Sequence, residues 1–76
     1  MNRGMLWFDK NPQTSIIQKV EIAIEYYTRK YGTKPTLCLA SSKQLKTSCK
    51  ISDTTWLQPY KSIPNWHFWI GQQDKS

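Results

Sequence analysis

A single amphipathic helix, expected from Ser15 to Gly32, limits the folds that this chain can adopt. Six apolar residues recur at the three- and four-residue spacing that places side chains on one face of a helix: Ile16, Val20, Ala23, Ile24, Tyr27 and Tyr31. The opposite face is polar, so only one side of the helix needs a packing partner. The rest of the chain must therefore supply an apolar surface that covers this stripe.

Local signals at both ends indicate where this helix begins and stops. Ser15 and Gln18 have the spacing of a capping box, in which each side chain binds a backbone amide that the helix leaves free. Asn11 with the proline after it is an alternative start one turn earlier, because proline suits a first helical position. Gly32 can adopt the left-handed conformation that ends a helix, and Pro35 prevents continuation.

The other apolar runs are short and predict the strands of a small sheet. Residues 5–8 precede the helix, residues 36–40 follow it, and residues 66–70 close the ordered part of the chain. Residues 46–51 alternate polar with apolar side chains, as a half-exposed strand does, and a short extended piece surrounds Trp56. The strands that flank the helix fit a β-α-β unit with parallel strands, although an antiparallel placement stays open.

These elements predict an α+β fold in which one amphipathic helix packs on a three- to four-stranded mixed sheet, in the order β-α-β-β-β. The chain of 76 residues is long enough for one domain, residues 1–76. We expect its two ends, residues 1–4 and 72–76, to be flexible.

A strong positive charge narrows the class of partner. Eleven Lys and Arg against five Asp and Glu give a formal net charge of +6. This balance favours an anionic partner, either nucleic acid or an acidic protein, and solubility is the alternative explanation because the lysines are spaced along the chain. No run approaches the ~20 apolar residues of a membrane helix. We expect a cytoplasmic protein with reduced cysteines and no membrane partner.

Few side chains have the chemistry of a metal site or a nucleophile. Cys38, Cys49 and His67 share no short spacing of the Cys-x-x-Cys kind, so we expect no metal and no cofactor. A hydrolase built from Cys49 and His67 would lack a nucleophile motif and a glycine-rich oxyanion turn, so it ranks third and we expect no catalytic residue. Asp9 follows the first strand, at the position where clefts form in α/β folds.

Basic and aromatic side chains carry the strongest functional signal. Cations recur from the end of the helix to the middle of the chain, and the last strand is expected to turn an imidazole and an indole outward. Single-stranded nucleic acids are bound by such sets, because the cations follow the phosphates while the rings stack on bases. The sequence therefore predicts a nucleic-acid-binding face formed by Arg29, Lys30, Lys34, Lys43, Lys46, Lys50, His67 and Trp69.

Two alternatives to this binding face follow from the same residues. In a purely structural role, Arg29 and Lys30 balance the helix dipole, the lysines keep a sheet edge soluble, and Trp69 covers a thin core. In a protein–protein adaptor or homodimer, Ile22 and Tyr26 form a second apolar strip on the helix that contacts another subunit together with Trp69.

The end of the helix and the last strand carry a recurring pattern: Ala23, Tyr26-Tyr27, Lys30-Tyr31-Gly32, Pro35 and His67-Phe68-Trp69-Ile70-Gly71. This pattern resembles that of short uncharacterised bacterial proteins that are often encoded near mobile elements. The likeness covers the helix, the second strand and the last strand, and leaves the middle of the chain unmatched. It implies a stand-alone bacterial or phage-like domain and brings no activity and no catalytic residue.

Overall fold

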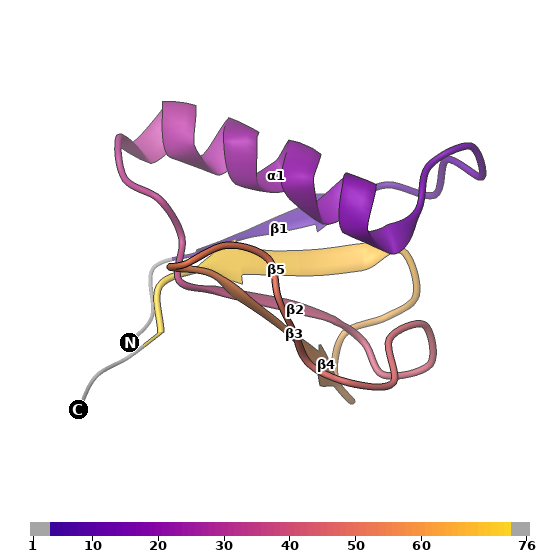
Figure 1. Ribbon diagram of the computed structural model, residues 1–76. Helices are drawn as coiled ribbons and strands as arrows, with labels where there is room; N and C mark the ends of the chain where they lie inside the picture. Colours follow the sequence, from indigo (N-terminus) through magenta and orange to yellow (C-terminus); the bar gives the residue numbers. More distant parts are fainter. Residues whose placement is uncertain (1–3, 74–76) are drawn as a thin grey trace.

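The computed structural model describes residues 4–73 and places one helix across one face of a five-stranded sheet (Figure 1). In chain order the elements are β1 (Gly4–Phe8), α1 (Ile16–Tyr31), β2 (Leu37–Ser41), β3 (Cys49–Lys50), β4 (Trp56–Tyr60) and β5 (His67–Gly71). The expected α+β class, with an amphipathic helix on a mixed sheet, is confirmed. The sheet has five strands, one more than the upper number expected.

Both ends of α1 follow the local signals in the sequence. The Ser15 hydroxyl accepts a hydrogen bond from the Gln18 amide at 3.1 Å, and the Ser15 amide donates to Gln18 Oε1 at 2.9 Å, which completes the capping box. Gly32 has φ 73° and its amide donates to the Thr28 carbonyl at 2.9 Å. The alternative start near Asn11 is not used, because the helix begins only after Ser15.

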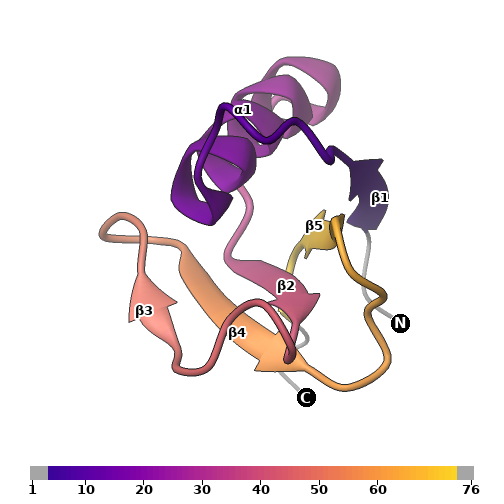
Figure 2. The same ribbon diagram turned by 90° about the vertical axis from the view of Figure 1, so that its right-hand side faces the viewer.

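The strands are arranged in the order β1-β5-β2-β4-β3. β5 pairs antiparallel with both β1 and β2, so the two strands that flank α1 run parallel to each other with β5 between them. β4 pairs parallel with β2, and β3 is antiparallel to β4. The carboxyl ends of β1, β2 and β4 therefore lie at the same edge of the sheet, which faces the viewer in Figure 2.

A proline inside β4 explains why the sequence suggested fewer strands. Pro59 signals a loop, yet it lies within β4 as the partner of Ala40 in β2. β3 is only two residues long, rather than residues 46–51, and pairs with Trp56 and Leu57 alone. The pairing with β3 therefore does not reach Pro59. At this position the outer side of β4 is unpaired, so it tolerates a residue without an N–H group.

The core lies between α1 and the sheet. In the register of the sheet, Phe68 of β5 lies between Trp7 of β1 and Ala40 of β2, so a large side chain fills the space beside a small one. The fully buried apolar residues come from the helix and from the strands β2, β4 and β5: Val20, Ala23, Tyr27, Cys38, Ala40, Leu57, Phe68 and Ile70.

Some residues in the two ends that were expected to be flexible pair in the sheet or form hydrogen bonds with the segment before β2. Gly4 is the first residue of β1. Gln72 Nε2 donates to the Lys34 carbonyl at 2.7 Å, and the Gln73 amide donates to Thr36 Oγ1 at 2.7 Å. The rest of those two ends, residues 1–3 and 74–76, lies outside the described residues.

Candidate functional site

The face of the sheet that points away from α1 carries large apolar and aromatic side chains. Leu6 and Phe8 of β1 are 62% and 56% exposed there, and Trp56 and Tyr60 of β4 are 45% and 51% exposed. Because successive side chains of a strand alternate between faces, the strand residues that are not in the core belong to this surface. We define it as the open face: Leu6, Phe8, Leu37, Leu39, Lys50, Trp56, Gln58, Tyr60, His67 and Trp69.

Two aromatic contacts give the open face a fixed shape over β1 and β5. The indole of Trp69 lies directly over Gly4, where a Cβ atom would collide with Cζ2 of the ring. A glycine at this position lets the indole lie against the sheet. Beside it, the rings of Phe8 and His67 pack with centroids 4.8 Å apart and an interplanar angle of 47°. Both contacts leave aromatic surface exposed to solvent.

The charge on the open face is positive. Lys50 of β3 is its one lysine within residues 4–73. Of the acids in that range, Asp9 pairs with a lysine of α1, Glu21 and Glu25 belong to α1, and Asp53 lies in the turn between β3 and β4. None of the strand residues that form the open face within residues 4–73 therefore carries a carboxylate.

Three of the eight residues predicted for a nucleic-acid face belong to the open face: His67 and Trp69 on β5, and Lys50 on β3, with β2 and β4 between these two strands. Lys43 and Lys46 lie in the loop from β2 to β3, at the carboxyl edge of the sheet. There the Lys46 ammonium donates to the Ser42 carbonyl at 3.2 Å.

The remaining three predicted residues lie elsewhere. Arg29 and Lys30 are in the last turn of α1, and Lys34 follows it, at the opposite edge of the sheet from the β2–β3 loop (Figure 1). Arg29 pairs with Glu25 at 3.5 Å, and the Lys30 ammonium lies 5.5 Å from the centre of the Tyr31 ring. The eight residues therefore do not form one surface.

Sequence reasoning did not assign Phe8, Trp56 and Tyr60 to the site. In β1, Met5 and Trp7 face the core and Phe8 faces outward, as the alternation of a strand requires. From the sequence, the run of four apolar residues was interpreted as a buried strand, so Phe8 was not assigned to a surface. Tyr60 follows Pro59, which was interpreted as the start of a loop although β4 continues to Tyr60. The alternation rule finds such residues once the strand bounds are known.

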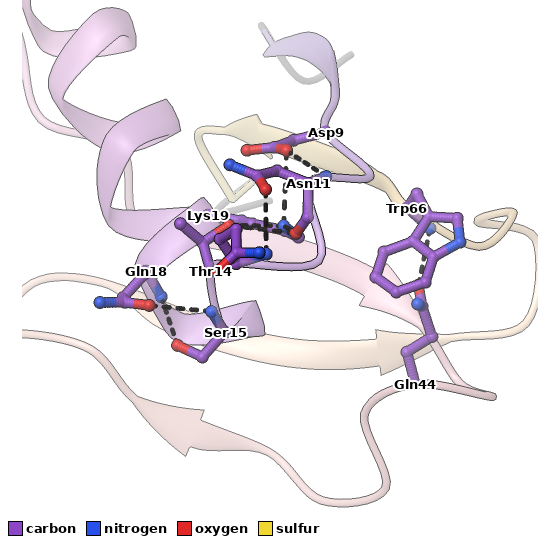
Figure 3. A network of polar contacts seen from close by, with 9 residues as sticks. Asp9, Asn11, Thr14, Ser15, Gln18, Lys19, Gln44 and Trp66 are labelled. Carbon is purple, nitrogen blue, oxygen red and sulfur yellow. Dashed lines mark hydrogen bonds and ion pairs between the residues drawn. The ribbon is translucent and has the colours of Figure 1, made fainter.

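A buried lysine organises the loop between β1 and α1 (Figure 3). Lys19 is fully buried, and its ammonium donates to Thr14 Oγ1 at 2.6 Å and to the carbonyl of Asn11. Asp9 Oδ1 lies 3.4 Å from the same ammonium and also accepts the Asn11 amide at 2.9 Å. Asp9, the acid that the sequence placed at a strand end, thus supports the loop.

Trp66 lies in the loop between β4 and β5. It joins the β1–α1 loop to the β2–β3 loop at the carboxyl edge, and its contact with Gln44 is drawn in Figure 3. Its amide donates to Gln44 Oε1 at 2.6 Å, and its carbonyl accepts the Asp9 amide at 2.9 Å. Trp66 has φ 67°, a left-handed conformation that costs a residue with a Cβ about 1–2 kcal/mol. That conformation does not continue a strand, so β5 begins at His67 rather than at Trp66 as expected.

The residues considered for a metal or a nucleophile are separated by the sheet. Cys38 and Cys49 are on the side that faces α1, whereas His67 is on the open face. β2 and β4 lie between the strands of Cys49 and His67. Within residues 4–73, no group of three or more His, Cys, Asp or Glu side chains is placed to hold a metal ion.

The two cysteines are free thiols and are too far apart to pair. Both are register partners of Leu57, one from each side of β4. Two strand spacings of about 4.8 Å separate their Cα atoms by roughly 10 Å, beyond the ~7 Å limit for a disulfide.

We expect the two thiols to differ strongly in reactivity. Burial raises the pKa of Cys38 from 9.0 to about 12, so almost no thiolate forms near pH 8, whereas Cys49 is half-buried. With an alkylating agent, mass spectrometry of the native protein should show one rapid modification, at Cys49, and a second only after denaturation. The Cys49→Ala variant should show no rapid modification. Equal rates for both thiols in the native protein would contradict this placement.

No protein-family model, curated protein or solved structure matches this chain. The likeness of the helix end and the last strand to short bacterial proteins therefore leads to no family. In the described part of the chain, no helix combines the length and the apolar character needed to cross a bilayer.

Proposed function

We propose that this protein is a non-catalytic binding module that holds single-stranded nucleic acid on its open face. The observation that carries the proposal is a sheet face with exposed aromatic rings on three strands and no described carboxylate. Stacking of one base on an aromatic side chain contributes about 1–3 kcal/mol and is tolerant of sequence, because every base has a π-face.

The positions of the rings suit several bases side by side. Trp69 lies flat over Gly4, and Phe8 is more than half exposed at the edge strand. Trp56 and Tyr60 stand at the two ends of β4, on the other side of β2. A strand of nucleic acid that crosses the sheet from β1 to β4 would therefore meet a ring at each side.

Positive charge supplies the sequence-independent part of the proposed affinity. Lys50 lies on the open face, and the net charge of +6 attracts a polyanion from a distance. Arg29, Lys30 and Lys34 are not part of the proposed site, because they lie at the end of α1 on the other side of the sheet. Their roles are to balance the helix dipole and to keep the surface soluble.

A cytoplasmic location belongs to this proposal. Both cysteines are free, and their positions on β2 and β3 do not allow a disulfide between them. Free thiols are the usual state in a reducing compartment, where nucleic acid is also present.

A protein partner is the second candidate, and the aliphatic part of the open face favours it. Leu6 on β1 is 62% exposed, and Leu37 and Leu39 lie half-buried on β2, on the other side of β5. Apolar patches of this kind mark protein interfaces. The homodimer considered from the sequence joins Ile22 and Tyr26 with Trp69, but the first two lie on α1 and Trp69 lies on the opposite side of the sheet, so one flat contact does not include all three.

The test compares two tyrosines of similar exposure. Tyr60 on the open face is 51% exposed and Tyr26 on α1 is 48% exposed. With a labelled single-stranded oligonucleotide of about 15 nucleotides, Tyr60→Ala should weaken binding by about 5- to 150-fold in fluorescence anisotropy. Tyr26→Ala should leave the affinity within about twofold, since surface changes away from the site have small effects.

Charge variants and salt provide the second arm of the test. Lys50→Glu should weaken binding, whereas Lys30→Glu at the helix end should have a much smaller effect. Affinity should fall when salt rises from about 50 to 200 mM, because phosphate contacts release counterions. A salt-independent affinity, or equal losses in Tyr60→Ala and Tyr26→Ala, would contradict the proposal. Concentration-dependent self-association without oligonucleotide binding would favour the protein partner.

A further inference from the structure

A pocket with both polar and apolar lining residues lies at the carboxyl ends of the parallel strands β2 and β4. Its volume is about 330 Å³, and it is lined by Ser41, Ser42, Lys43, Lys61, Ile63, Pro64 and Asn65. In open sheets, ligands bind outside the carboxyl ends of parallel strands, where the loops diverge. The pocket therefore lies where ligands commonly bind in folds with parallel strands.

The lining of the pocket is positive. Lys43 comes from the loop after β2 and Lys61 from the loop after β4, so two different segments each contribute a lysine to the lining. Ser42 and Asn65 add polar side chains, and no acid lines the pocket. Two cations with neutral donors between them are suited to an anion with several oxygens.

The walls of the pocket are held by hydrogen bonds. The hydroxyl of Ser41, which is buried, donates to Asn65 Oδ1 at 2.8 Å and accepts the Lys43 amide at 3.1 Å. The bond to Oδ1 directs the amide oxygen of Asn65 toward β2 and leaves its NH₂ group available to a ligand. Next to Asn65, the bond between Trp66 and Gln44 joins the two loops that form the walls.

The pocket adjoins the open face at the end of β4. Ser41, which lines the pocket, is the register partner of Tyr60, whose side chain is on the open face, and Lys61 follows Tyr60 in the chain. A nucleic acid that stacks on Tyr60 would therefore bring a phosphate group close to the pocket.

We propose that this pocket binds a phosphate monoester, and that its source is the terminal phosphate of a nucleic-acid strand lying on the open face. The inference rests on the proposed function and deepens it. A monoester carries a charge of about −1.5 to −2 and three strong acceptor oxygens, which matches two ammonium groups and the donors of Ser42 and Asn65. At about 330 Å³, the pocket is at the lower end of the size range of small-ligand sites, and it suits a chain end.

The first experiment measures the affinity for one oligonucleotide in three forms: with a 5′-phosphate, with a 3′-phosphate and with neither. One phosphorylated form should bind the native protein about tenfold more tightly than the unphosphorylated form, a difference of about 1.4 kcal/mol. Lys43→Ala with Lys61→Ala should remove this preference and change the affinity for the unphosphorylated form little. Lys50→Ala, the matched control on the open face, should weaken all three forms equally and keep the preference.

The second experiment separates the pocket from the binding of nucleic acid. Inorganic phosphate, titrated against sodium chloride at equal ionic strength, should shift the backbone amide NMR signals of Ser42, Lys43 and Asn65 saturably in the native protein, but not in the double variant. Equal affinity for the three oligonucleotides overturns the strand-end pocket, even if all three bind and the proposed function holds. Saturable phosphate shifts without oligonucleotide binding would support the pocket, with a free phosphate monoester as its ligand, and contradict the nucleic-acid function. If neither phosphate shifts nor oligonucleotide binding is observed, both the pocket proposal and the nucleic-acid function are overturned.

Discussion

Phe68→Ala is expected to lower the free energy of unfolding by about 3–5 kcal/mol. Phe68 is fully buried on β5, between Trp7 and Ala40 in the sheet register and beneath α1. Truncation removes the ring from the centre of the core and leaves a cavity. A chain of 76 residues has a total stability of only about 4–11 kcal/mol, so this one change removes a large part of it.

The second phenylalanine of the chain is the matched control. Phe8 is on the open face and is 56% exposed, so Phe8→Ala should cost less than about 1 kcal/mol. Urea unfolding followed by far-UV circular dichroism should show a much lower midpoint for Phe68→Ala and a nearly unchanged one for Phe8→Ala. Equal midpoints for the two variants would mean that the helix does not cover the side of the sheet described here.

Lys19→Met is expected to lower the free energy of unfolding by about 3 kcal/mol, at the lower end of the cost of breaking a buried ion pair. The ammonium of Lys19 satisfies Asp9, Thr14 and the carbonyl of Asn11 at once, and without it the first loop loses its common partner. The Asp9 side chain keeps 22% of its surface exposed, so water relieves part of the loss.

The neighbouring exposed lysine provides the control for this variant. Lys10 lies in the same loop and is exposed, so Lys10→Met should change stability by less than about 0.5 kcal/mol. Asp9→Asn combined with Lys19→Met should be less destabilised than the sum of the two single changes, because residues in one network are coupled. Equal stabilities of Lys10→Met and Lys19→Met in urea unfolding would show that Lys19 is not buried in solution.

The burial of Lys19 also shows where a helical pattern stops being informative. Lys19 precedes Val20 at the edge of the apolar stripe, and by residue type it belongs to the solvent side. It is covered because residues 9–14 fold back over the first turns of α1 and point a carboxylate, a hydroxyl and a carbonyl at its ammonium. Such an arrangement depends on three groups that meet in space, and no spacing in the sequence encodes it.

The candidate site also has a part that the sequence was sufficient to predict and a part that depends on contacts between distant residues. The outward positions of His67 and Trp69 follow from the alternation of one strand, and the sequence was sufficient to predict them. The grouping of Arg29, Lys30 and Lys34 with the later lysines assumed that the middle of the chain lies near the helix end. In the structure Lys43 and Lys46 are at the other edge of the sheet, because β2 carries the chain across before that loop begins.

Local chemistry in the sequence determined the α+β class, the bounds of the helix and the outward side of the last strand. The caps of α1 and the alternation of strands are interactions between residues no more than four apart, so they are present in the sequence itself. Only the tertiary structure decided that β5 inserts between β1 and β2, that Lys19 is buried, and that Lys50 is the lysine on the described part of the open face. These features depend on contacts between residues far apart in the chain, and burial in one core selects them.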